Sequence, residues 1–383
     1  MKKGIAFSGG GYRATLFALG SLWRLNDEGM LPTFDTITSV SGGSIATGLL
    51  ALNWDKLTFS NRQTSGKLAV ATNFDEWVAQ PLIAFCNHSI DISSTLKGLV
   101  TPNKTVGDYL REKYDELLYS HRSLRDIDQS SSAPQFVFYG TNYDTGASVR
   151  ICKEYFRDYR IGIAYDHDLS LAQAVSISSC FPPFFAPIEL AGEHWRWESL
   201  GPMSDLCDRP ELKKKLVLCD GGLYDNLGIE MLWKIGDRKE YSHVYVVDSG
   251  APFKAPYQYS DNLLGKALKL IKWRNNWVSQ YARMTDIMIN QQRALRKRWL
   301  INNYIENAYQ GKYWGIDTEI EKYDVIDILA TTTPANRSLE SLPTQLRPFD
   351  KHTVESLINW SYALADAALR AENPDIKKGT LPF

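Results

Sequence analysis

Two short apolar strands, each followed directly by a glycine-rich turn and a helix, occupy the first fifty residues. The first strand, Gly4–Phe7, leads into apolar side chains at helical spacing over residues 15–23. The second strand, Asp35–Val40, is rich in β-branched residues and leads into another helix over residues 45–50. Strand–helix units this close in sequence place successive strands side by side with helices on their faces. The pattern therefore predicts an α/β fold with a mainly parallel sheet.

Later strand patterns extend this sheet, at Gln135–Tyr139, Lys215–Cys219 and His243–Val247. The 383 residues are 44% hydrophobic, which is enough to bury a sizeable core. We expect a three-layer α/β/α sandwich without internal repeats or an interdomain linker. The expected layout is one domain over residues 1–383, with a core at about 4–250, a helical insertion at about 55–130 and a C-terminal helical region at about 260–383.

Charge and cysteine content limit the class of protein. The net charge of −1 argues against a globally basic nucleic-acid binder. The five cysteines are scattered without a CxxC pair, so the sequence indicates neither a zinc site nor a disulfide framework, and a reducing cytosol fits. No stretch approaches the ~18 uninterrupted apolar residues of a membrane span. We expect a cytoplasmic protein, peripheral at a membrane if it meets one, with no cofactor and no metal.

Ser41 stands where the second strand turns into its helix, between small residues. In a nucleophile elbow a serine occupies a strained strand–helix turn with its hydroxyl exposed, and the residues two before and two after it must be small. Here these positions are Ser39 and Gly43, so Ser39 departs slightly from the usual glycine. Ser41 is therefore a candidate nucleophile. The alternative is a glycine- and serine-rich loop that only caps the helix.

Three consecutive glycines, Gly9, Gly10 and Gly11, connect the first strand to the first helix. They leave backbone N–H groups unshielded beside the positive end of a helix, where an anion can be held. The loop suits an oxyanion hole, but with Ala14 it also satisfies a relaxed dinucleotide-binding fingerprint. A dinucleotide site needs an acidic residue near the end of the second strand, and Asp35 lies at that strand's start. The oxyanion hole is favoured, and a dinucleotide-binding oxidoreductase is the alternative.

Asp220 ends an apolar strand and is followed by Gly221 and Gly222. Because the carboxyl ends of parallel strands meet at one edge of a sheet, we expect Asp220 to lie beside Ser41. A carboxylate with an ordinary pKa near ~3.9 is a poor base, so burial must raise its basicity for it to activate a serine. The alternative is a turn in which Asp220 only caps its own backbone.

Taken together, these stretches resemble motifs of the patatin-like and cytosolic phospholipase A family, in the family's order. They are the glycine loop at residues 8–14, the elbow at 40–44, a segment at 171–185 and the base motif at 220–222. The resemblance implies a patatin-like fold and a Ser–Asp dyad that hydrolyses lipid acyl esters without histidine. It also implies that Arg13 assists with the substrate phosphate, whereas the residues alone equally allow an ion pair at the helix start. A catalytically silent lipid-binding protein on the same fold is a further alternative.

Residues 264–300 combine nine basic side chains and one acidic side chain with aromatic and apolar residues at helical spacing. One interpretation is a helix that rests on an anionic membrane surface, as access to membrane or micellar lipid would require. The other is a helix that packs its apolar stripe on the core and keeps its charges in solvent. We do not expect this segment to bind nucleic acid, because the whole chain is nearly neutral.

Overall fold

A single mixed sheet runs through the chain in the computed structural model, which describes residues 1–60, 69–90, 106–127, 133–182, 185–253 and 277–383. Within these residues the strand order is β11-β10-β1-β2-β3-β4-β5-β6-β8, and β9 pairs with both β3 and β7. The strands are β1 (Lys2–Phe7), β2 (Thr36–Ser39), β3 (Gln135–Asn142), β4 (Ser148–Ile151), β5 (Phe156–Asp158), β6 (Gly162–Ala164), β7 (Ile188–Leu190), β8 (Trp197–Glu198), β9 (Leu216–Asp220), β10 (Tyr241–Asp248) and β11 (Tyr313–Gly315).

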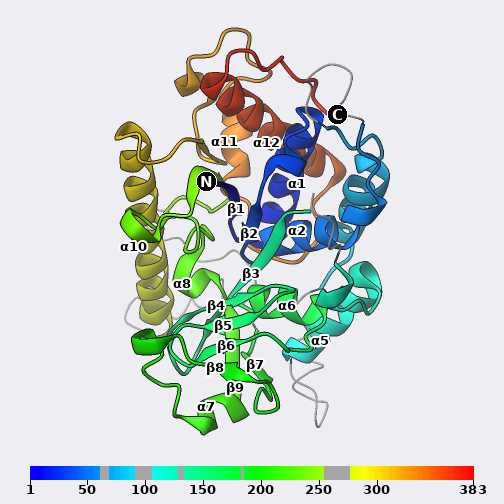
Figure 1. Ribbon diagram of the computed structural model, residues 1–383. Coiled ribbons are helices and arrows are strands. Elements are labelled where there is room, and N and C mark those ends of the chain that lie inside the picture. The colour runs from blue at the N-terminus through cyan, green and yellow to red at the C-terminus, as the bar shows by residue number, and fades with distance from the viewer. Residues whose placement is uncertain (61–68, 91–105, 128–132, 183–184, 254–276) are drawn as a thin grey trace.

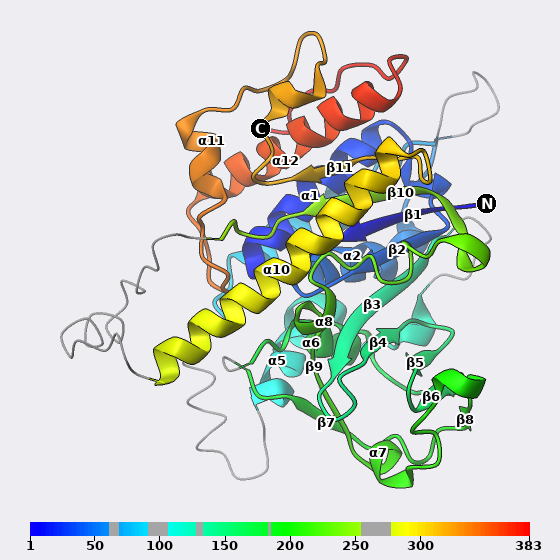
Figure 2. The ribbon, with the colours of Figure 1, turned by 90° about the vertical axis from the view of Figure 1, so that its left-hand side faces the viewer.

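The five strands from β11 to β3 are parallel, and those from β4 onward pair antiparallel. The expected, mainly parallel core is therefore present, with an antiparallel extension that strand periodicity did not reveal. Helices cover both faces of the parallel part, which gives the three layers (Figures 1 and 2). The helices are α1 (Gly11–Asp27), α2 (Gly42–Leu52), α3 (Gln80–Cys86), α5 (Val106–Tyr114), α6 (Leu171–Ser179), α7 (Pro210–Lys214), α8 (Gly222–Asp225), α10 (Trp277–Ile305), α11 (Pro334–Leu339) and α12 (Lys351–Glu372).

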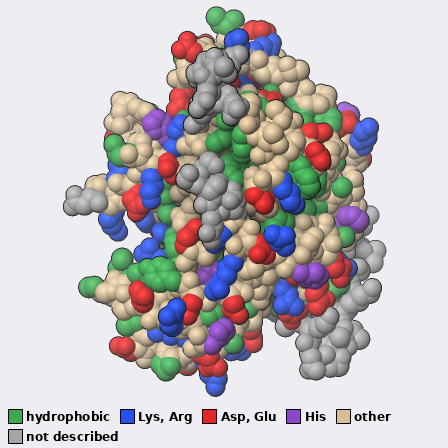
Figure 3. Space-filling view, turned by 45° about the vertical axis from the view of Figure 1, so that its right-hand side comes forward, with side chains coloured by type: hydrophobic (Ala, Val, Ile, Leu, Met, Phe, Trp, Pro, Cys, Tyr) green, Lys and Arg blue, Asp and Glu red, His purple; other side chains and the backbone are tan. Residues whose placement is uncertain are grey.

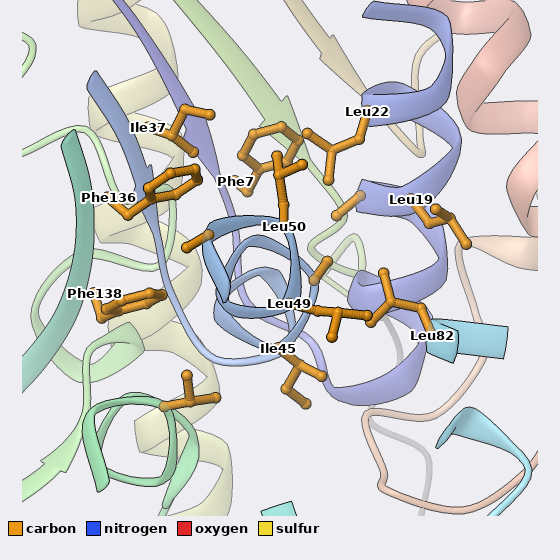
Figure 4. Close-up of a cluster of buried hydrophobic side chains, with 14 of the residues drawn as sticks. Phe7, Leu19, Leu22, Ile37, Ile45, Leu49, Leu50, Leu82, Phe136 and Phe138 are labelled. Atoms are coloured by element: carbon orange, nitrogen blue, oxygen red, sulfur yellow. The ribbon is translucent and has the colours of Figure 1, made fainter. Parts of the chain in front are cut away.

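The larger core lies between the sheet and the helices α1, α2 and α12. Alternation along the strands sends one set of side chains to this face, and Figure 4 shows them meeting those of α1 and α2. The labelled side chains are Leu19 and Leu22 of α1, Ile45, Leu49 and Leu50 of α2, Leu82 of α3, and Phe7, Ile37, Phe136 and Phe138 of the sheet. This packing fixes α1 and α2, and with them the turns at which both helices begin.

A second, smaller core lies on the opposite face of the sheet. Ala6 of β1 and Val244 and Val246 of β10 point there, and they pack in a cluster with Leu227 and with Leu300 of α10. α10 crosses this face as a long surface helix (Figure 2). Among the α10 side chains that the structure describes, the fully buried apolar one is Leu300, near the C-terminal end of the helix.

Two segments differ from or extend the sequence-based layout. In the expected insertion at 55–130, the described residues include α3 and α5, with short single-turn segments at Asp75–Ala79 before α3 and at Asp115–Tyr119 and Leu124–Asp126 after α5. The mixture of glycine, proline, tryptophan and charged residues at 188–214 predicts a long surface loop. The structure instead has β7, β8 and α7 in this segment. Their strands are two or three residues long, too short for a period-two pattern to stand out.

The surface carries charges of both signs. Figure 3 shows one face on which acidic and basic side chains are interspersed, in keeping with the net charge of −1. Among the described residues, no helix combines the length and the apolar character needed to cross a bilayer.

Candidate active site

Ser41 forms the turn between β2 and α2 in a conformation that side chains rarely adopt, with φ 53° and ψ −121°. The turn is closed by backbone approaches that only small residues permit. A Cβ on Gly43 would lie 2.7 Å from the carbonyl oxygen of Phe7, and one on Gly42 would collide with the carbonyl oxygen of Gly11. Ser39 fits because its hydroxyl turns inward and accepts hydrogen bonds from Ser44 and Thr47. The local geometry is that of a nucleophile elbow.

α6 supports the elbow from a distant part of the sequence. The N–H of Ser41 donates to the carbonyl oxygen of Ser178 at 3.1 Å and to its hydroxyl at 3.0 Å. The Ser178 hydroxyl also lies 2.9 Å from that of Ser44. Sequence reasoning placed Ser178 in a stretch that resembles the family but gave it no function. Its only local signal was a run of small polar residues at the end of an apolar helix.

The register of β3 explains why Asp220 meets Ser41. Ser39 of β2 pairs with Phe138, and Asp220 of β9 pairs with Gly140, two residues further along the same strand. β4 pairs with the same stretch of β3, so β2 and β9 share the opposite edge and their carboxyl ends approach each other. The expectation that Asp220 ends a parallel strand was wrong, because β9 is antiparallel to β3.

The Asp220 side chain is buried, with 2% of its surface exposed. Burial raises the pKa of Asp220 from its ordinary value of 3.8 to about 7, against hydrogen bonds from the Gly222 N–H and the Ser41 hydroxyl that lower it. The Gly222 N–H lies 2.6 Å from one carboxylate oxygen. The Ser41 hydroxyl therefore lies close enough to interact with the Asp220 carboxyl group, which titrates close to neutral pH.

The glycine loop lies directly against Ser41. Gly10 and Gly11 have φ values of 147° and 59°, which glycine tolerates and other residues strain to reach. A Cβ on Gly9 would lie 2.9 Å from the Cβ of Ser41, so only glycine allows this approach. No described residue accepts a hydrogen bond from the N–H of Gly10 or of Gly11. Both donors stand beside the candidate nucleophile at the start of α1.

Asn226 connects the glycine loop to the loop after Asp220. Its carbonyl oxygen accepts the Gly9 N–H at 3.1 Å. A Cβ on Gly9 would lie 2.5 Å from the side-chain oxygen of Asn226, and a Cβ on Gly222 would lie 2.8 Å from the same oxygen. Asn226 lies outside the base motif at 220–222, and the sequence alone gave no sign of its position between the two loops.

Arg13 lies inside the protein, with 1% of its surface exposed. Its guanidinium donates to the carbonyl oxygens of Ser249, at 3.0 Å, and Leu342, and to the hydroxyl of Thr344 at 3.3 Å. The predicted ion pair at the start of α1 would need a carboxylate, whereas these hydrogen bonds of Arg13 go to carbonyl and hydroxyl oxygens. The contacts tie the start of α1 to the chain after β10 and to residues 342–344. Binding of a substrate phosphate by Arg13 stays a prediction.

Other chemistries find less support at this site. All six histidines lie in described residues, and none bonds to Ser41 or Asp220; His167 and His243, for example, bond to Cys152 and Ser242. The carboxylate of Asp35 accepts the N–H of Lys3 at 2.7 Å, at the end of the parallel strands opposite to Ser41. It is thus remote from the glycine loop that a dinucleotide would occupy. Among the described residues, no cluster of three or more metal-binding side chains was found.

The model of one protein family, described as patatin-like phospholipase, matches residues 5–233. The chain belongs to the patatin-like phospholipase family. The matched range contains the glycine loop, Ser41 and Asp220, which the fold brings together. No curated protein sequence matches the chain.

A solved structure of a human cytosolic phospholipase A2 shares the fold. Human GIVD cytosolic phospholipase A2 aligns over 97% of this chain and 60% of its own, with a TM-score of 0.51 and 11% identity. The same enzyme in complex with methyl gamma-linolenyl fluorophosphonate inhibitor and terbium chloride gives a TM-score of 0.51 and 12% identity, over 97% of this chain and 59% of its own. VipD from Legionella pneumophila aligns over 96% of this chain and 67% of its own, with a TM-score of 0.36 and 14% identity. The chain thus spans about three fifths of the human enzyme's length.

Proposed function

We propose that this patatin-like phospholipase hydrolyses acyl esters of membrane or micellar lipids, as a phospholipase A or a lysophospholipase, with a Ser41–Asp220 dyad. The observation that carries the proposal is that the Ser41 hydroxyl interacts with a buried Asp220 whose pKa is about 7, at the turn where β2 and β9 bring the two residues together. A base poised near neutral pH is matched to deprotonating a serine hydroxyl. The N–H groups of Gly10 and Gly11, beside Ser41, can stabilise the negative charge that forms on the carbonyl oxygen during acyl transfer.

In the first half of the reaction, the ionised Asp220 takes the proton from the Ser41 hydroxyl as its oxygen bonds to the ester carbonyl carbon. The carbonyl oxygen becomes an oxyanion, which the N–H groups of Gly10 and Gly11 stabilise. When the intermediate collapses, the bond to the alcohol oxygen breaks and that oxygen takes the proton back from Asp220. The acyl group is then held as an ester of Ser41.

In the second half, water replaces the alcohol. Asp220 accepts a proton from water as its oxygen attacks the acyl carbon, and the same N–H groups hold the oxyanion. The bond to Ser41 breaks, the serine oxygen recovers its proton from Asp220, and a fatty acid leaves. A single carboxyl group thus serves both halves, because a pKa near 7 allows it to accept and to return a proton.

Lipid is the proposed substrate class because of the family to which the chain belongs. The human relative with this fold binds a fluorophosphonate with a long unsaturated chain, and this supports a site that accepts acyl chains. We place the enzyme in the cytoplasm, acting on lipid as a peripheral protein.

The experiment is hydrolysis of defined lipids by the purified protein and two variants. Diacyl phospholipids, lysophospholipids and triacylglycerols are incubated separately, and the released fatty acids and lysolipids are identified by mass spectrometry. Ser41→Ala and Asp220→Asn are expected to lose activity on every substrate while keeping the wild-type circular dichroism spectrum. A catalytically silent lipid-binding protein would release nothing in any form, and a dinucleotide-dependent enzyme would instead bind NAD(P)H in a fluorescence titration.

A further inference from the structure

α10 is oriented with Arg293 and Arg296 inward and much of its apolar surface outward. Arg293 is 9% exposed and its Nε lies 2.7 Å from the carboxylate of Asp248, which is fully buried. One turn later the Nε of Arg296 lies 3.3 Å from the carboxylate of Asp225, which is 1% exposed. The sequence-based interpretation in which the charges of this helix stay in solvent is therefore wrong for these two side chains.

The exposed side of the helix carries an apolar stripe, which we define as Tyr281, Met284, Met288 and Leu295. These side chains are 51%, 51%, 56% and 59% exposed. At 3.6 residues per turn, they fall within an arc of about 60°, and the centre of this arc lies about 120° around the helix from the mean direction of Arg293 and Arg296. The interpretation in which the whole apolar side of the helix packs on the core thus fails for these four side chains, whereas Trp299 packs against the second core. Residues 264–276, the remainder of the segment, lie outside the described residues.

The two ion pairs prevent the helix from turning its stripe inward. A rotation of half a turn would carry both arginines away from Asp248 and Asp225. Each buried carboxylate would then lose its partner, which is strongly destabilising. Leu300, fully buried on the inner side, would be moved into solvent as well. The exposure of the stripe is therefore a consequence of the fold, and an apolar surface kept in solvent in this way is typical of an interaction site.

The charge of α10 indicates which kind of partner can bind the apolar stripe. α10 contains five basic side chains and one acidic side chain, Asp286. The arc of the stripe carries no carboxylate among the described residues, and Arg298 is exposed at its edge. The guanidinium of Arg283 lies 4.0 Å from the ring centre of Phe253, a further apolar side chain at 42% exposure. A second copy of this chain would bring like charges together, whereas anionic lipid headgroups complement them.

We propose that α10 docks the protein on an anionic lipid surface through the apolar stripe, with Arg298 and the other basic side chains of the helix that do not face inward against the headgroups. The proposal deepens the proposed function and rests on it for the nature of the substrate. Through Arg296 and Asp225, the docking helix is tied to the loop that begins at Asp220. Through Arg293 and Asp248, it is tied to Ser249, whose N–H and hydroxyl bond to Ser8 and Gly9 of the glycine loop. A docked α10 thus holds both halves of the candidate site at the lipid surface.

The test measures binding without turnover, in a Ser41→Ala background. Vesicles of phosphatidylcholine containing phosphatidylserine, and vesicles of phosphatidylcholine alone, are sedimented with the protein. The test variant is Met284→Gln, Met288→Gln and Leu295→Gln together, which removes apolar surface without changing charge or weakening helix propensity. The matched control is Met203→Gln with Ile326→Gln, which removes two apolar side chains, 50% and 89% exposed, outside α10.

The parent protein is expected to bind the anionic vesicles more strongly than the neutral ones. The test variant is expected to bind them at least ~10-fold more weakly, a loss of about 1.4 kcal/mol, and the control to stay within about twofold of the parent. Equal binding by the parent and the test variant would overturn the proposal. So would a parent dimer that the test variant converts to a monomer in light scattering, because a second copy would then be the occupant. Hydrolysis of a soluble short-chain ester by the protein with Ser41 intact tests the proposed function separately, since it requires no vesicle.

Discussion

Replacing Asp220 with asparagine is expected to abolish turnover and to stabilise the fold at neutral and alkaline pH. Burial raises the pKa of Asp220 from 3.8 to about 7 in the folded state. The folded protein therefore binds this proton more tightly than the unfolded chain does, so its stability falls as pH rises from 3.8 towards 7. At about 1.36 kcal/mol per pKa unit, the raised pKa lowers the stability by about 2 kcal/mol near pH 5, where the folded protein still holds the proton, and by about 4 kcal/mol above pH 7, where the buried carboxylate is ionised. Asparagine removes this cost and keeps an oxygen to accept the Gly222 N–H.

The assay is urea unfolding followed by tryptophan fluorescence, which the eleven tryptophans make sensitive, at acidic and alkaline pH. Asp248→Asn is the matched control, because it changes another buried aspartate at the end of a strand, one paired with Arg293 at 2.7 Å. That variant leaves a buried guanidinium without its carboxylate and is expected to lose about 3–5 kcal/mol. If Asp220→Asn were less stable than the wild type above pH 7, it would not be true that burial of the ionised Asp220 carboxylate destabilises the fold.

Three further predictions concern the same site. First, kcat/KM for a soluble ester is expected to rise with pH and to level off above a midpoint near pH 7, the pKa of Asp220. The reason is that Asp220 must be ionised to accept the Ser41 proton. A midpoint near pH ~4 would indicate an ordinary, solvated carboxylate. Second, Gly9→Ala places a Cβ 2.5 Å from the side-chain oxygen of Asn226 and 2.9 Å from the Cβ of Ser41. The loop must shift to make room, and misplacement of the Gly10 and Gly11 donors is expected to lower kcat at least ~100-fold; wild-type kcat would mean that the glycine loop is not part of the site. Third, Gly43→Ala places a Cβ 2.7 Å from the carbonyl oxygen of Phe7 and is expected to lower the free energy of unfolding by ~1–3 kcal/mol. Urea titration measures this change. An unchanged urea midpoint would mean that the turn at Ser41 is packed less tightly than its contacts indicate.

The sequence was sufficient to predict those parts of the site that are locally encoded. Gly9, Ser41 and Asp220 each stand at the end of an apolar strand with small residues around them, and this context is visible within ten residues. The sequence was not sufficient to predict how Asp220 reaches Ser41, because the antiparallel register between β9 and β3 joins residues about 80 apart. The structure places all three together, although by a different strand direction from the one expected.

The orientation of α10 shows a second limit of sequence reasoning. Helical periodicity identifies which side chains share a face, but it does not say which face is inward. Apolar faces usually are, and here the outcome depends on Arg293 and Arg296, whose carboxylate partners lie 45 and 71 residues earlier in the chain. Ser178 was missed for the same reason, because its contact with the Ser41 N–H spans 137 residues.

The most direct test of the central claim is covalent labelling with a fluorophosphonate that carries a long acyl-like chain. Labelled wild-type protein, Ser41→Ala and Asp220→Asn are digested, and the modified peptide is located by mass spectrometry. The account predicts one adduct on Ser41 in the wild type, none in Ser41→Ala, and much slower labelling in Asp220→Asn. Labelling of a different serine, or full esterase activity in Ser41→Ala, would contradict it.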